Sequence, residues 1–160
     1  MQTRKVAQAV ILVAIAVALS PIFIPLGFIK LFPAQHMINV IGGVMLGPWY
    51  ALGIATAAAI IRNLLGVGTP LAFPGGMIGA FLAGWAYILF RRTYAAALGE
   101  VLGTGFLGAL VSVWLVAPML MKKTMAASVM MGAFAASSLA GAVLGVAALQ
   151  VLRKAGIWRE

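Results

Sequence analysis

Long apolar runs alternate with short groups of basic, glycine and proline residues along almost the whole chain. A helix needs about 20 apolar residues to cross the hydrocarbon core of a bilayer. The runs predict six transmembrane helices in a compact bundle, and the second and third runs are short for a full crossing. We therefore expect an all-α integral membrane domain covering residues 1–160, with spans at 6–19, 34–46, 51–65, 77–90, 95–120 and 127–152.

Two segments between these runs are rich in proline or glycine. Residues 20–33 contain Pro21, Pro25 and Pro33, which lack the N–H that a continuous helix needs. We expect a structured loop with an embedded turn there, and a glycine- and proline-rich connection at residues 66–76. The first run also resembles a secretory signal peptide, with Ala16-Val17-Ala18 as a cleavage site. Against this alternative, the chain stays hydrophobic long after that run.

Small residues recur four positions apart within the runs. Small side chains at this spacing let helix backbones approach closely in a membrane, so we expect tight helix packing. No internal repeat is visible, so an inverted-repeat transporter is not supported. The pairs are Ala14/Ala18, Ala16/Ser20, Gly43/Gly47, Gly75/Gly79, Ala80/Gly84, Gly99/Gly103, Gly105/Ala109 and Gly141/Gly145.

The composition points to the same class. Of the 160 residues, 64% are hydrophobic and 8% are charged, and the mean hydropathy is +1.14. A soluble domain has about 25% charged residues, and a disordered chain is polar, so both classes are excluded. There is no cysteine, one histidine and two acidic residues, so disulfides, cysteine nucleophiles and a metal cage are not expected, and no cofactor is predicted.

The net charge is +9, and we interpret it as a signal of membrane orientation and not of nucleic-acid binding. The basic residues form short pairs between apolar runs, whereas phosphate binding needs a basic face. Basic loops stay in the cytoplasm. With both termini in the cytoplasm, seven basic residues lie inside and four lie outside, which favours this orientation. Those inside are Arg4, Lys5, Arg91, Arg92, Arg153, Lys154 and Arg159, and those outside are Lys30, Arg62, Lys122 and Lys123.

Three polar residues open the second span. Gln35 and Asn39 are four positions apart and His36 and Asn39 are three apart, so they share one helix face. Polar side chains in lipid are costly and usually face an internal cavity. We expect them to offer amide and imidazole groups to one pocket. The alternative is that they satisfy the nearby proline-rich backbone.

Further polar residues lie in the third and fifth spans. Arg62 and Asn63 lie near the outer end of the third span, and Glu100 shares a helix face with Thr104. A lone carboxylate within a membrane indicates a functional site. Arg62 either snorkels to the outer surface or pairs with Glu100, and the pair is either structural or a ligand contact.

Trp114 lies in the outer half of the fifth span and is the best tryptophan for stacking on a ligand ring. The alternative role is membrane-interface or packing residue. No G-x-x-x-x-G-K-[ST], H-E-x-x-H or G-x-S-x-G motif occurs, so no catalytic set is predicted. A transporter of this size without an ATP site would need an energy module from a partner.

Five strings taken together resemble one known family. They are FPAQHMINV at 32–40, LGPWYA at 46–51, IRNLLG at 61–66, LAFPGGMIGA at 71–80 and GEVLGTG at 99–105. The set is similar to the ThiW family, the thiazole-specific substrate-binding (S) subunits of energy-coupling factor (ECF) transporters. The resemblance spans most of residues 1–150 and implies a six-helix bundle with cytoplasmic termini.

The resemblance also implies a ligand and partners. Such subunits capture hydroxyethylthiazole outside the cell and dock on a transmembrane coupling subunit, EcfT, with two ATPases. It assigns Ala14 and Ala18 to docking and residues 21–32 to a lid. The ligand is a small neutral ring with a hydroxyl tail, which suits an apolar slot with a few polar groups. The expected substrate-binding residues are Gln35, His36, Asn39, Arg62, Asn63, Phe73, Met77, Glu100, Thr104 and Trp114.

Several alternatives remain at this stage. The ligand could instead be thiamin or its pyrimidine precursor, although the positive charge of thiamin asks for more acids or aromatics than the sequence has. From a different class, the protein could be a membrane-embedded enzyme that uses Glu100 and His36. A third alternative is an assembly factor without a ligand.

Overall fold

The computed structural model describes residues 2–26, 29–122 and 124–158. Lys123 and Arg159, which entered the charge count, lie outside the described residues. The chain begins with helix α1 (Gln2–Ala18), which carries most of its side chains at the surface. Ser20 ends this segment by donating a hydrogen bond to the carbonyl oxygen of Ala16, 2.8 Å away.

The proline-rich segment contains a short β-hairpin, which the sequence predicted only as a loop with a turn. Strand β1 (Ile24–Leu26) pairs antiparallel with β2 (Ile29–Leu31), and Pro25 lies opposite Lys30. Proline is compatible with an edge strand where its nitrogen, which has no N–H, faces away from the partner strand. The hairpin is followed directly by the second helix.

The short second and third runs form helices α2 (Pro33–Leu46) and α3 (Pro48–Leu64). Proline occupies the first turn of each helix, where the backbone N–H has no intrahelical partner. Gly47 joins them with a φ of +90°, a conformation that favours glycine. At 1.5 Å per residue the 14 residues of α2 span about 21 Å, less than the hydrocarbon core of about 30 Å.

Helix α4 (Ala72–Phe90) starts five residues before the predicted span. Pro74 and the two glycines after it were assigned to the connection, but proline is tolerated in the first helical turn. After the Arg91-Arg92 turn comes one continuous helical rod. It consists of α5 (Thr93–Leu102), η1 (Gly103–Gly108), α6 (Ala109–Val111), η2 (Ser112–Val116) and α7 (Ala117–Leu120).

The segments η1 and η2 are π-helical, so the rod is wound more loosely there. Pro118 explains η2, because its ring removes the N–H that would bond to the carbonyl of Trp114 and crowds that carbonyl. Short π-helical turns inside α-helices often occur at functional sites. The last helix, α8 (Ala127–Lys154), runs back along the whole bundle.

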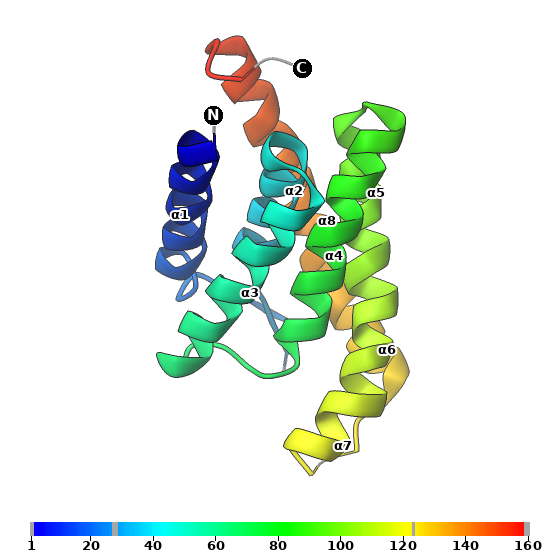
Figure 1. The fold of residues 1–160 in the computed structure, drawn as a ribbon. Helices are drawn as coiled ribbons and strands as arrows, with labels where there is room; N and C mark the ends of the chain where they lie inside the picture. Colours follow the sequence, from blue (N-terminus) through cyan, green and yellow to red (C-terminus); the bar gives the residue numbers. More distant parts are fainter. Residues whose placement is uncertain (1, 27–28, 123, 159–160) are drawn as a thin grey trace.

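Figure 1 shows the arrangement of these helices. Helix α1 lies at one side, α3 and α4 lie in the middle, and the α5–α7 rod lies at the other side. Helix α8 lies behind, and α2 packs mainly against it and against α4. The N- and C-termini lie at the same end of the molecule, and α7 lies at the opposite end.

Glycines allow α4 and the α5–η1 rod to cross at backbone contact. A Cβ added to Gly103 would lie 2.7 Å from the Cα of Gly79, and one added to Gly108 would collide with the Cα of Gly75. Gly141 and Gly145 of α8 meet α2 in the same way. The glycine spacings thus do mediate tight helix packing, except at Gly47, which serves the turn, whereas Ala14 and Ala18 of the predicted pairs are exposed on α1.

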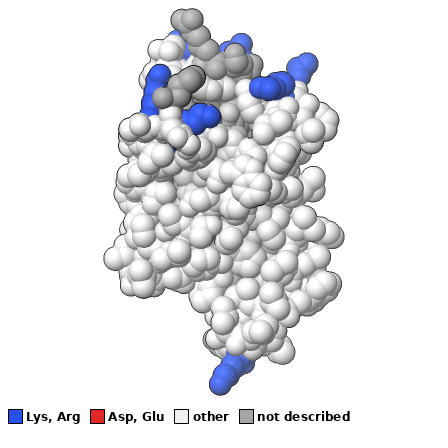
Figure 2. Space-filling model, in the orientation of Figure 1, with Lys and Arg blue, Asp and Glu red and all other residues white. Residues whose placement is uncertain are grey.

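The surface fits a membrane environment. Within the described residues, three helical stretches are long and apolar enough to cross a bilayer: Ala72–Phe90, Thr93–Leu120 and Ala127–Lys154. Three of the six predicted crossing helices therefore have the length to cross a bilayer. Helices α1, α2 and α3 are shorter. Figure 2 shows the Lys and Arg side chains of the visible face gathered at the two ends, mostly at the end with the termini.

Candidate functional site

A cavity of about 390 Å³ opens in the half of the molecule away from the termini. Residues from β2, α2, α3, α4, η1 and α8 form its wall, together with Met125 before α8. Ligand pockets are typically about 300–1,000 Å³, mostly apolar, with a few convergent polar groups. Another hollow of about 460 Å³ lies between α1 and α3, but its lining is almost entirely apolar. The cavity near η1 is therefore the candidate site.

A chain of hydrogen bonds crosses one wall of the cavity. Arg62 donates from Nη1 to Oε1 of Gln35, and Nε2 of Gln35 lies 3.0 Å from Nε2 of His36. On the other side of the ring, Nδ1 of His36 lies 2.7 Å from Oε1 of Glu100. The chain links α3, α2 and α5 and ends in a positive group at one end and a carboxylate at the other.

The donors and acceptors of this hydrogen-bond chain set the roles of the two ring nitrogens of His36. A guanidinium has only donors, so the side-chain oxygen of Gln35 must face Arg62 and its NH2 group must face His36. Nε2 of His36 is then an acceptor, and Nδ1 carries the proton that it donates to Glu100. With this orientation of the Gln35 amide, one nitrogen of the His36 ring faces a donor and the other faces the Glu100 carboxyl group.

Glu100 anchors the buried end of the chain, and its side chain is fully buried. Its Oε1 receives His36, Thr104 at 2.8 Å and Asn39 at 3.3 Å, while Oε2 has no hydrogen-bond partner among the residues that the structure describes. The Thr104 hydroxyl also lies 2.9 Å from the carbonyl oxygen of Gly75, and the Asn39 amide lies 3.3 Å from that of Gly76. Glu100 thus holds α2, α4 and the α5–η1 rod together.

Arg62 does not behave as either alternative predicted. It is only 4% exposed, so it does not snorkel to the surface, and its hydrogen bond goes to Gln35 and not to Glu100. Its guanidinium also lies 5.1 Å from the centre of the Phe32 ring, and its Nε is buried without a partner in the described part of the chain. The prediction that Arg62 and Glu100 are linked is met only indirectly, through Gln35 and His36.

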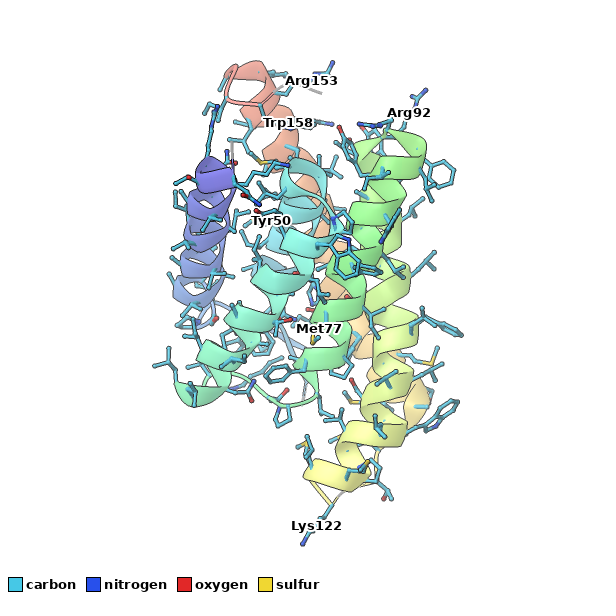
Figure 3. The ribbon with its side chains drawn as sticks, viewed as in Figure 1. Tyr50, Met77, Arg92, Lys122, Arg153 and Trp158 are labelled. Atoms are coloured by element: carbon cyan, nitrogen blue, oxygen red, sulfur yellow. The ribbon has the colours of Figure 1, made fainter. Side chains whose placement is uncertain are left out.

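The predicted substrate-binding residues take different positions relative to the cavity. Gln35, His36, Arg62 and Thr104 line the cavity, whereas Asn39 and Glu100 lie behind them. Asn63 caps the end of α3, with its amide 2.8 Å from the carbonyl oxygen of Ala59. Trp114 is 70% exposed on the outer surface of the rod. Phe73 and Met77 are half-buried on α4 outside the cavity wall, and Figure 3 shows Met77.

Helix α8 supplies a face of the cavity that the sequence did not indicate. Met130, Ala133, Phe134 and Ser137 follow one another at helical spacing and line it, with Met125 just before the helix. A lone serine within an apolar stripe was the available signal. Ser137 accepts a hydrogen bond from the backbone N–H of Phe32 at 2.8 Å. This bond attaches the end of the β-hairpin to α8.

The end of the β-hairpin forms part of the cavity wall. Lys30 and Phe32, on β2 and just after it, both line the cavity. Lys30 is exposed and its ammonium lies 4.4 Å from the centre of the Phe23 ring. Leu71 and Ala72 add apolar wall on the α4 side. Among the described residues no three His, Cys, Asp or Glu side chains lie close enough together to bind a metal ion.

Comparison with known proteins identifies relatives. A family model described as "Thiamine-precursor transporter protein (ThiW)" matches residues 6–155. Among solved structures, a chain from "Structure and mechanism of the S component of a bacterial ECF transporter" is similar, with a TM-score of 0.70 and 13% sequence identity. The match covers 98% of this chain and 97% of that chain. No curated protein sequence matches this chain.

Proposed function

The chain belongs to the ThiW family of thiamine-precursor transporter proteins, and from this premise we propose that it is the substrate-capture subunit of an ECF-type importer for hydroxyethylthiazole. It binds the ligand from the extracellular side, and an ATP-driven coupling module moves it inward. The fold that this chain shares with an S component supports this proposal.

One observation carries the proposal: a small cavity has a polar chain on one wall and apolar groups on the others. A thiazole is a flat ring with one nitrogen acceptor and a short substituent. Phe32, Leu71 and Phe134 offer apolar area for the ring, while Gln35 and Thr104 offer hydrogen bonds. Intact thiamin carries a positive charge, and Arg62 and Lys30 on the cavity wall disfavour it.

Calorimetry on the detergent-purified subunit tests the assignment. We expect saturable submicromolar binding of hydroxyethylthiazole and much weaker binding of thiamin and of the pyrimidine precursor. Phe134→Ala should weaken thiazole binding about tenfold or more, since it removes a ring from the wall. Phe106→Ala is the matched control, because Phe106 is 50% exposed and lies outside the cavity wall. Tighter binding of thiamin or of the pyrimidine would reassign the substrate.

The enzyme alternative gains little from this geometry. Glu100 is fully buried and does not line the cavity, and Nε2 of His36 is bonded to Gln35, so neither group is poised on an open substrate. If the alternative held, Glu100→Gln would abolish the turnover of a lipid or isoprenoid substrate. We expect the purified protein to leave such substrates unchanged.

We further propose that α1 docks on the transmembrane coupling subunit EcfT, which works with two ATPases in the plasma membrane of a prokaryote. Ala14 and Ala18 are both exposed on α1, whereas Ala16 is buried. Ala14→Trp with Ala18→Trp should abolish co-purification with the coupling module and leave thiazole binding intact. Val143→Trp with Ala147→Trp, on an exposed face of α8, is the matched control. A stable complex of the α1 variant would refute this docking surface.

A further inference from the structure

We propose that the thiazole bound in this cavity carries an anionic group, a phosphate ester or a carboxylate, and that Arg62 binds it. This inference rests on the proposed thiazole-capture function, but it replaces the neutral hydroxyethylthiazole with an anionic thiazole as the preferred ligand. The reason lies in the charges around the cavity.

Arg62 is a buried positive charge without an anion beside it. Among the described residues its contacts are the amide oxygen of Gln35 and the face of the Phe32 ring, and its Nε has no partner. A dipole and an aromatic ring compensate a charge only in part, and a buried charge without a counter-ion strongly destabilises a fold. A ligand anion in the cavity would be the missing partner.

The carboxylate within the bundle is not available for this role. Glu100 accepts hydrogen bonds from His36, Asn39 and Thr104 and is separated from Arg62 by two residues of the hydrogen-bond chain. The sequence contains only one other acid, Glu160, which is outside the described residues. The described cavity wall therefore has two cations, Lys30 and Arg62, and no acidic residue.

The two cations differ in position, which suits capture from solution. Lys30 is exposed on β2 at the cavity wall, whereas Arg62 is buried at the end of α3. An exposed cation attracts anions to the mouth of a cleft, and a guanidinium forms strong, directional hydrogen bonds with phosphate or carboxylate oxygens. Thr69 and Gln35 line the same region and can bond further oxygens.

The test compares ligands and charge variants by calorimetry on the full chain in detergent. The ligands are hydroxyethylthiazole, its phosphate ester, a thiazole carboxylate and inorganic phosphate. In the unmodified protein an anionic thiazole should bind about tenfold or more tightly than the alcohol, as expected for one charge-assisted hydrogen-bonded pair. Inorganic phosphate alone should bind weakly, because it lacks the ring.

Arg62→Gln should reduce this preference to about threefold or less, mainly by weakening the anionic ligands. Lys30→Gln should slow the association of the anionic ligands and have little effect on the alcohol. Lys122→Gln removes a charge at the same end of the molecule but away from the cavity, so it should change neither. If Arg62→Gln does not fold, the test rests on two other measurements. These are the preference of the unmodified protein for anionic thiazoles over the alcohol, and the same preference in Arg62→Lys.

The outcomes separate this inference from the function itself. If the alcohol binds as tightly as the anionic thiazoles, or if Arg62→Gln leaves their ratio unchanged, the anionic ligand is refuted and the thiazole subunit stands. If no thiazole binds, the proposed function fails. If inorganic phosphate binds as tightly as the esters, the site recognises a free anion and not a thiazole.

Discussion

At the scale of single residues, the hydrogen bonds of Glu100 explain why a buried acid is found in such an apolar chain. It is fully buried, and three side chains, two from α2 and one from its own rod, donate to one of its oxygens. Its role is to fix the ring of His36 and the hydroxyl of Thr104, both of which face the cavity. A neutral amide at this position cannot accept the same set of hydrogen bonds with equal strength.

Glu100→Gln should therefore lower the free energy of unfolding by about 1.5–3 kcal/mol, the value of a hydrogen bond to a charged group. Thermal unfolding of the detergent-solubilised protein measures this change. Gln150→Ala is the control, since it removes an exposed 3.2 Å bond to Tyr94. Its stability should stay within about 0.5 kcal/mol of the unmodified protein. Equal stability of the two variants would mean that the buried hydrogen bonds of Glu100 add nothing to the free energy of unfolding.

Helical spacing was enough to predict which polar side chains gather, but not how they pair. Gln35, His36 and Asn39 do lie on one side of α2, and Glu100 and Thr104 do meet. Spacing along one helix gives the height of a residue, whereas a direct Arg62–Glu100 contact depends on which helices are neighbours. In the structure α2 lies between them and supplies Gln35 and His36 as the link. The outward position of Trp114 was hidden from the sequence for the same reason.

At the scale of elements, the crossing of α4 with the α5–η1 rod positions the polar chain. A Cβ on Gly79 would collide with Oγ1 of Thr104 and lie 3.0 Å from Oε1 of Glu100. The backbone of α4 can approach the carboxylate only because residue 79 has no side chain. The sequence predicted this close packing from small residues four apart, although not its link to the site.

Gly79→Ala should destabilise the protein by about 1–3 kcal/mol through overpacking, and it should also weaken thiazole binding. Gly53→Ala is its matched control on α3, because a Cβ there meets nothing within 4 Å. Alanine is the better helix former, so this control should raise stability by about 0.5–1 kcal/mol. Thermal unfolding and calorimetry on both variants check the contrast.

The hairpin is the element that the sequence described least well. Its strands have three residues each, too short for an alternating pattern, and prolines obscure them. Its attachment to α8 depends on the long-range bond between Phe32 and Ser137. No local pattern could have indicated that contact.

Ser137→Ala leaves the N–H of Phe32 without this acceptor, so the hairpin should open more often. We expect the thiazole dissociation rate to rise several-fold, as about 1 kcal/mol of hydrogen bonding is lost. Stopped-flow fluorescence or surface plasmon resonance measures the rate. Ser138→Ala, whose bond stays within α8, should leave it unchanged. The same rate in both variants would show that the hairpin does not retain the ligand.

At the scale of the whole molecule, the basic side chains of the visible face lie at the two ends (Figure 2), whereas Arg62 is buried at the cavity wall. Arg92 and Arg153 lie at the end with the termini, and Lys122 lies at the other end (Figure 3). Between these ends, large hydrophobic side chains are exposed on the helices, as on a surface in contact with lipid. The excess of basic residues at the termini favours that end as the cytoplasmic one.

The absence of cysteine makes this orientation easy to test. Lys122→Cys should react with a membrane-impermeant maleimide added to intact cells, and Arg92→Cys should react only after the membrane is opened. The reverse pattern would place the cavity on the cytoplasmic side and would contradict uptake from outside. The unmodified chain provides the background for labelling.

The position of Gln35 between Arg62 and His36 means that one mutation can change the charge balance of the cavity. Glutamine and glutamate codons differ at their first base alone, so one point mutation gives Gln35→Glu. The new carboxylate would lie against the guanidinium and complete an internal ion pair. A single base change would therefore replace the counter-ion that we propose the ligand supplies with one that the protein carries itself.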